Sequence, residues 1–108
     1  MEINNLKALQ REILLGFWKA HILYHASKGP LVGRWMLREL GRHGYEISPG
    51  TLYPILHRLE RRGYIASEKK TVHGRMRRVY RITPAGQKAF EEALHKVREL
   101  FTELIEEA

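Results

Sequence analysis

The segment from Ser48 to Pro84 constrains the fold most, because it contains two helix starts of the same kind. At Ser48-Pro49 and again at Thr83-Pro84, a hydroxyl residue comes directly before a proline. Serine and threonine are favoured as N-cap residues, and proline is favoured in the first helical turn. We therefore expect one helix to begin near residue 48 and another at residue 84.

The first of these helices is predicted to span residues 48–62. Its apolar residues recur with the spacing of one helical face: Leu52, Ile55, Leu56 and Leu59. Gly63 is expected to end the helix. Pro54 is expected to bend its first turns, because proline cannot donate the backbone hydrogen bond of the preceding turn.

Two strand-like runs follow, at residues 64–70 and 77–83. The intervening residues 71–76 include a glycine, and a glycine-containing turn between two such runs is typical of a hairpin. In the second run Tyr80 alternates with Val79 and Arg81, so its ring is expected to face inward.

Two more helices are predicted before residue 48. The helix at residues 5–26 carries apolar residues three or four positions apart, with a second apolar row beside them: Leu6, Leu9, Ile13, Phe17, Ala20 and Tyr24, then Leu15, Trp18 and Ile22. So wide an apolar arc must be covered from more than one side, either by the rest of this domain or by a second subunit. A shorter helix is predicted at residues 31–42, with Met36, Leu37 and Leu40 facing inward.

Three helices, a two-stranded hairpin and a final helix follow one another in the order of a winged helix-turn-helix fold. The predicted fold class is therefore mainly α with a small β-hairpin, flanked by N- and C-terminal helices. In such a domain the second helix braces the third, and the third presents its free face to the DNA major groove.

The net charge of +7 is concentrated in the middle of the chain. Residues 30–83 hold twelve basic and four acidic side chains, whereas residues 84–108 hold three basic and six acidic ones. A cluster of cations favours a polyanionic partner, because phosphates neutralise the repulsion between like charges. The alternatives are that the charged helix face is merely solvated and that the charged hairpin only prevents strand aggregation.

We therefore predict that residues 1–83 form a double-stranded-DNA-binding domain and residues 84–108 a dimerisation helix. The candidate DNA contacts on the helix at residues 48–62 lie opposite its leucines: Thr51, Tyr53, His57, Arg58 and Arg61. The candidate contacts of the hairpin are cationic or titratable: Lys69, Lys70, His73, Arg75, Arg77 and Arg78. Arg58 and Tyr53 are the candidates for base contact. The alternative is a basic RNA-binding or ribosome-associated module, for which Tyr80 is the only strand-centre aromatic platform.

Two motifs also resemble the PadR-type transcriptional regulators, in the short branch of that family with a single C-terminal helix. The sequence TLYPILHRLE at residues 51–60, followed by Gly63-Tyr64-Ile65, is similar to their recognition helix. The sequence RRVYRITPAG at residues 77–86 is similar to their second wing strand and the following helix start. The resemblance implies DNA contact by Thr51, Tyr53, Arg58, Gly74, Arg75 and Arg77. Residues 31–35, LVGRW, depart from the usual pattern of the family.

The resemblance also implies a homodimeric, usually repressing, cytoplasmic regulator that a small molecule or another signal releases from an inverted-repeat operator. The last helix supports dimerisation, because its apolar residues form a heptad seam: Phe90, Leu94, Val97, Phe101 and Leu104. Phe17, Trp18 and Phe101 are candidate residues of a pocket for an aromatic or apolar effector. The alternative is that these aromatic residues belong only to the dimer core.

Other chemistries are not indicated by the sequence. It contains no cysteine, and it has no phosphate-binding glycine loop, nucleophile elbow or paired carboxylates in an apolar setting, so we expect neither an enzyme nor a cofactor. His21 and His25 have a spacing that suits metal chelation, but the more favoured interpretation is a pair of packed histidines. No apolar run is long enough for a membrane span, and no secretory signal is expected.

Overall fold

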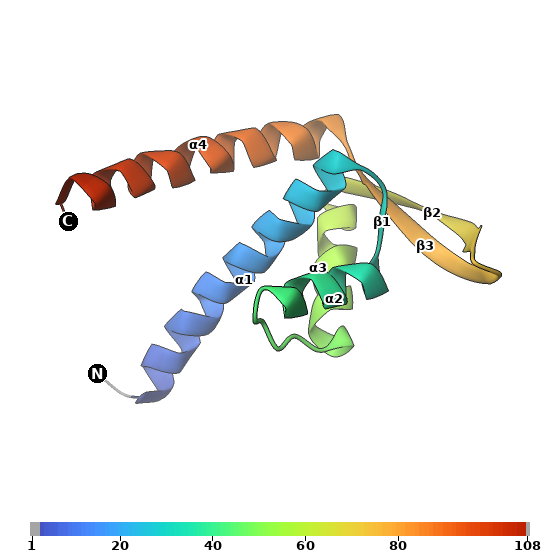
Figure 1. Ribbon diagram of the computed structural model, residues 1–108, viewed down its shortest axis with the longest axis horizontal. Helices are drawn as coiled ribbons and strands as arrows, with labels where there is room; N and C mark the ends of the chain where they lie inside the picture. The colour runs from blue at the N-terminus through green and yellow to red at the C-terminus, as the bar shows by residue number, and fades with distance from the viewer. Residues whose placement is uncertain (1–2, 108) are drawn as a thin grey trace.

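The computed structural model describes residues 3–107, and their architecture confirms the predicted winged helix-turn-helix fold (Figure 1). The elements in chain order are α1 (Ile3–Lys28), β1 (Leu31–Val32), α2 (Gly33–Arg42), α3 (Pro49–Arg61), β2 (Ile65–Val72), β3 (Arg75–Ile82) and α4 (Pro84–Glu107). The hairpin of β2 and β3 projects away from the helices as a wing. Helices α1 and α4 diverge from a shared end near β1 (Figure 1).

The sheet has three strands, where the sequence predicted two. Residues 31 and 32, assigned to the second helix by their sequence, form the short strand β1 and pair antiparallel with β3. Leu31 lies opposite Tyr80, and Val32 lies opposite Val79. The strand order is β1-β3-β2. This added strand fixes the start of α2 against the wing.

The turn of the wing is tighter than predicted. Both strands extend further than expected, so that Val72 pairs with Arg75 and only His73 and Gly74 form the turn. These two residues have φ angles of 51° and 78°. Two consecutive residues with positive φ match the right-handed twist of the strands, and glycine adopts such angles without steric cost.

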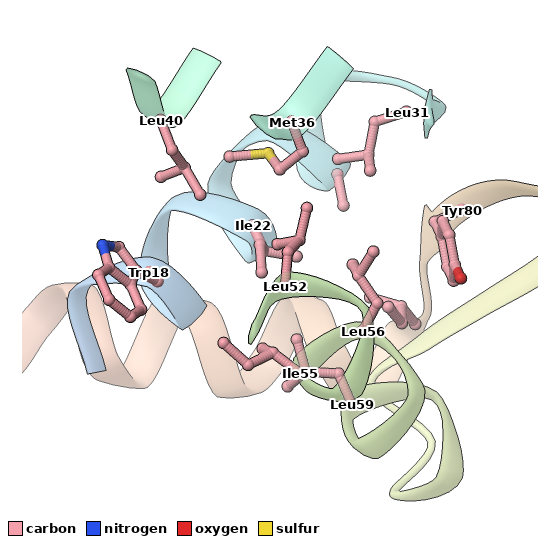
Figure 2. Packing of buried hydrophobic residues seen from close by; sticks show 12 residues of the cluster. Trp18, Ile22, Leu31, Met36, Leu40, Leu52, Ile55, Leu56, Leu59 and Tyr80 are labelled. Carbon is pink, nitrogen blue, oxygen red and sulfur yellow. The ribbon is translucent and has the colours of Figure 1, made fainter. Parts of the chain in front are cut away.

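The hydrophobic core lies where α1, α2, α3 and the sheet meet. Figure 2 shows Ile22 of α1, Met36 of α2 and Leu52 of α3 packed together, with Tyr80 of β3 at one end and Trp18 at the other. All four apolar residues predicted to face inward from the third helix are buried. The helix also continues through Pro54 to Arg61, so this proline is accommodated.

The two predicted N-caps behave differently. The side chain of Ser48 makes no capping hydrogen bond, although its carbonyl oxygen accepts hydrogen bonds from the backbone of Thr51 and Leu52. The Thr83 hydroxyl caps α4 as predicted, because it accepts a hydrogen bond of 3.0 Å from the backbone N–H of Gly86. The same hydroxyl donates a hydrogen bond of 2.6 Å to the carbonyl oxygen of Gly63.

Helix α4 is held tightly at its base and extends freely beyond it. Gly86 is buried against the carbonyl of Tyr64, and the rings of Tyr24 and Phe90 lie 6.1 Å apart. Further along, both long helices expose their apolar residues in a single chain: Leu6, Leu9, Ile13 and Phe17 of α1, and Val97, Leu100, Phe101, Leu104 and Ile105 of α4.

Candidate nucleic-acid interface

Helix α3 presents the predicted polar face to solvent. His57, Arg58 and Arg61 are exposed, while Thr51 and Tyr53 are half-buried at the two edges of the face. The opposite side of the helix is fixed by core packing. Core packing therefore leaves this face free to contact a ligand.

The cations of the wing lie on both faces of the hairpin and not on one. Lys69 lies opposite Arg78, and Lys70 lies opposite Arg77. Because successive residues of a strand point to opposite faces, these two pairs lie on different sides of the sheet. Lys70 is also paired with Glu68, its Nζ lying 3.1 Å from the carboxylate.

The N-terminal part of α2 completes the basic surface, which the sequence did not predict. Arg34 and Arg38 of α2 line a hollow of about 300 Å³ together with Arg75 and Arg77 of the wing. No carboxylate is among the residues that line it. The i, i+4 spacing of Arg34 and Arg38 could have indicated a shared face, but only the pairing of β1 with β3 places that face beside the wing.

Tyr53 links the recognition face to this basic surface. It lines a second hollow, of about 140 Å³, with Gly33 and Arg34 of α2 and with Met76 and Arg78 of the wing. A Cβ atom at Gly33 would lie only 2.6 Å from Cε1 of the tyrosine ring. The glycine in the unusual stretch at residues 31–35 therefore makes room for the ring.

A polar network joins α3 to the wing. A carboxylate oxygen of Glu60 accepts hydrogen bonds from the backbone N–H and the hydroxyl of Ser67. Arg78 Nη1 donates a hydrogen bond of 3.0 Å to the same hydroxyl. This network fixes the angle between the helix and the hairpin, since it connects α3, β2 and β3 through one serine.

Tyr80 faces inward, as its alternation predicts. It is 1% exposed, and burial, together with the nearby Glu60 carboxylate, raises the pKa of its hydroxyl. A buried ring cannot serve as a stacking platform for an unpaired base.

The candidate effector residues do not share one site. Phe17 lines an apolar groove of about 270 Å³ between α1 and α4, with Tyr24, Phe90, Leu94 and Val97 among the other lining residues. Trp18 points into the core, where its ring packs edge-on against Tyr45 at 6.0 Å, and it is 5% exposed. Phe101 lies beyond the groove and is 62% exposed.

The search for other kinds of site gives two findings. Among the described residues no group of three histidine, cysteine or acidic side chains is arranged to hold a metal ion, and His21 and His25 stack with ring centroids 6.3 Å apart. None of the helices within residues 3–107 has the length and apolar character needed to cross a membrane.

Comparison with known proteins is consistent with this geometry. Residues 22–92 match the model of the transcriptional regulator PadR-like family. The chain is 50% identical over 95 residues to the transcriptional regulator Rv3488 of Mycobacterium tuberculosis, and the match covers 88% of this chain and 89% of the relative.

Solved structures show the same fold. A PadR-like transcription factor from Bacteroides fragilis matches with a TM-score of 0.79 at 22% identity, covering 94% of this chain and 99% of that one. A PadR family regulator from Eggerthella lenta matches with a TM-score of 0.77 at 26% identity, covering 95% and 91%. Members of this family are DNA-binding regulators and not enzymes. The protein therefore belongs to the PadR-like family of transcriptional regulators.

Proposed function

We propose that this regulator is a homodimeric repressor that binds a specific double-stranded operator in the cytoplasm. One observation carries the proposal: the free face of α3, the wing cations and the arginines of α2 adjoin one another through Tyr53 and the hollows around it. In this proposal α3 enters the major groove, with Arg58 and Tyr53 at the bases. The wing residues and Arg34 contact phosphates on either side.

Duplex DNA is favoured over RNA by the shape of this surface. An exposed helix with short and cationic side chains fits the major groove of B-form DNA, whereas the deep groove of A-form RNA excludes it. Recognition of unpaired bases needs exposed aromatic rings on a strand, and Tyr80 is buried.

A homodimer is supported by the apolar residues that one chain leaves uncovered. Phe17 is 50% exposed and Leu104 is 58% exposed, and each is part of a longer stripe on its helix. Contiguous exposed apolar surface of this kind marks an interaction site. A second copy supplies the same two stripes, so we propose that α4, residues 84–108, packs against α1 and α4 of the partner.

Two-fold symmetry then dictates the form of the operator. The two α3 helices of the dimer would enter successive major grooves, so the operator should be an inverted repeat with half-sites about one helical turn apart. Selection of bound duplexes from a random pool tests this directly. Recovery of one inverted repeat would support the proposal, whereas tighter binding to single-stranded RNA than to any duplex would refute it.

The apolar groove between α1 and α4 is the proposed site for a releasing signal. Its lining includes Phe17 and Phe90, so it suits an aromatic or apolar small molecule. A ligand seated there would contact both helices of the proposed dimer interface. A compound that raises the Tm of the free protein and also displaces the selected duplex would identify such an effector.

The wing contact is tested by Arg75→Ala. If Arg75 binds a phosphate, its loss weakens binding to all duplexes alike and lowers the slope of log K against log salt by about one. The slope is measured by fluorescence anisotropy at several salt concentrations. Lys88→Ala, which removes an exposed cation from α4, is the matched control and should leave the slope unchanged. An unaltered slope for Arg75→Ala would contradict a phosphate contact by this residue.

The position of Tyr53 is tested by Gly33→Ala. The added methyl group would displace the tyrosine ring, so we expect weaker discrimination between the selected duplex and a random one, by about tenfold for the loss of one base contact. Both affinities are measured for each variant. Gly41→Ala in the same helix has open space around its Cβ and serves as the control. Undiminished discrimination in Gly33→Ala would rule out a base contact by Tyr53.

A further inference from the structure

Three histidines gather around one carboxylate where α1 packs against α2. His25 Nε2 of α1 and His43 Nε2, which follows α2, lie 3.4 and 3.2 Å from Oε2 of Glu39. The ring of His21 stacks at 4.8 Å from that of His43 and at 6.3 Å from that of His25. We refer to His21, His25, Glu39 and His43 as the histidine cluster.

The one carboxylate of the cluster already has a permanent cationic partner. Arg42 donates hydrogen bonds to both oxygens of Glu39, at 3.0 and 2.8 Å. These bonds are the main reason that the pKa of Glu39 falls to about 2, so the pair stays ionised throughout the range in which histidines titrate. Each proton taken up by the cluster therefore adds net positive charge.

The surroundings disfavour that charge. Burial lowers the pKa values of His21 and His25, and the neighbouring histidines lower them further, while Glu39 opposes the change. The packing around the cluster contains further cations and aromatic rings. These groups are Tyr24 and Lys28 of α1, Trp35, Arg38 and Arg42 of α2, Tyr45 of the following loop, and Lys70, His73 and Arg81 of the wing. On the side of α4, His21 meets the apolar residues Phe90, Ala93, Leu94 and Val97.

The cluster lies between the two functional parts of the molecule. Helix α1 carries the exposed stripe that we assign to the dimer, whereas α2 braces the recognition helix α3. His21 belongs to both regions, because it also lines the apolar groove between α1 and α4. A change in how α1 packs on α2 would thus alter the distance between the two recognition helices of a dimer.

We propose that the histidine cluster is an acid-sensitive joint: protonation of its histidines loosens α1 from α2 and thereby releases the regulator from DNA. The inference rests on the proposed function for its effect on DNA, but the loosening itself is a property of the free protein.

The direction of the pH dependence follows from the lowered pKa values of His21 and His25. Below the ordinary histidine pKa of 6.5, the unfolded chain binds protons that the folded chain resists. The stability that the neutral cluster contributes is therefore complete above that pH and is lost as the pH falls through the lower folded values. Protonation of His57 or His73 beside a phosphate would act in the opposite direction, since it strengthens DNA binding.

The first test uses the free protein in buffer with EDTA, so that only protons are bound. We expect the Tm of the wild type to fall between pH 7.5 and pH 5.5, and this fall to be largely absent in His21→Gln/His25→Gln. His95→Gln removes a well-exposed histidine of α4 and should keep the wild-type profile. Equal falls in all three proteins would overturn the proposal. If the double variant does not fold, NMR titration of the wild type decides, and a His21 pKa at or above 6.5 refutes the joint.

The second test measures affinity for the selected duplex at the same two pH values. His57→Gln/His73→Gln removes the opposing effect at the interface and serves as the background. On it we expect acidification to weaken binding by about fivefold or more, within the usual range of coupling between sites. Adding His21→Gln/His25→Gln should abolish this loss, and an unchanged loss would refute the joint. Absence of duplex binding at pH 7.5 would instead refute the proposed function and leave the Tm test standing.

Discussion

Replacing Phe101 and Leu104 together by glutamine should convert the protein into a monomer and lower its affinity for the operator by about a hundredfold or more. Both side chains are more than half exposed in one chain and lie on the apolar stripe of α4. Glutamine keeps a good helix propensity, so α4 itself should still form. The loss arises because a dimer binds both half-sites together, and a monomer gains nothing from the second half-site.

Light scattering gives the mass of the variant, and anisotropy gives its affinity for a full operator and for a half-site. The matched control is Glu103→Gln/Glu106→Gln, which introduces the same residue type on the opposite side of α4. We expect the control to remain dimeric. If the Phe101/Leu104 variant is a dimer at micromolar concentration, the stripe of α4 is not the dimer interface.

Gly86→Ala should produce the largest loss of stability among single substitutions of this size. A Cβ atom at this position would overlap the backbone carbonyl oxygen of Tyr64 and press on Ile82. Backbone cannot give way as a flexible side chain can, so α4 would have to move off the end of the sheet. Overpacking of this kind costs about 3 kcal/mol, which corresponds to a fall in Tm of roughly 10 °C or more.

The free energy of unfolding is measured by urea titration, with calorimetry for the Tm. Gly41→Ala provides the comparison, because its Cβ would meet open space near the end of α2. There the substitution should be neutral or stabilise the protein by up to about 1 kcal/mol. A wild-type stability for Gly86→Ala would mean that α4 is not packed on the Tyr64 carbonyl in solution.

Local signals predicted most of the fold. The inward apolar residues of α3, the Thr83 cap of α4 and the inward-facing Tyr80 were all predicted correctly, because each depends on spacing or capping within a few residues. Strand β1 was missed because two residues carry no periodicity of their own. Leu31 and Val32 become a strand only by pairing with β3, which lies far along the chain.

The site residues show the same division between local and tertiary information. The predicted face of α3 is free, but Arg34 and Arg38 were missed because the pairing of β1 places α2 beside the wing. Phe17 and Trp18 are neighbours in sequence that point to different surroundings, one to the groove and one to the core. A stripe in the sequence shows that both are apolar, and only the packing of α2 and α4 decides which is covered.

The hydroxyl of Thr83 has a consequence for how operators are measured out. Through it and the adjacent backbone bonds, the end of α3, the end of β3 and the start of α4 are connected within one turn of chain. Helix α4 has 24 residues, so it is about 36 Å long, and a tilt of about 5° at its base moves its far end by about 3 Å. Small differences in how two α4 helices cross would therefore be multiplied into different half-site spacings. Relatives with the same recognition helix could in this way select operators of different length.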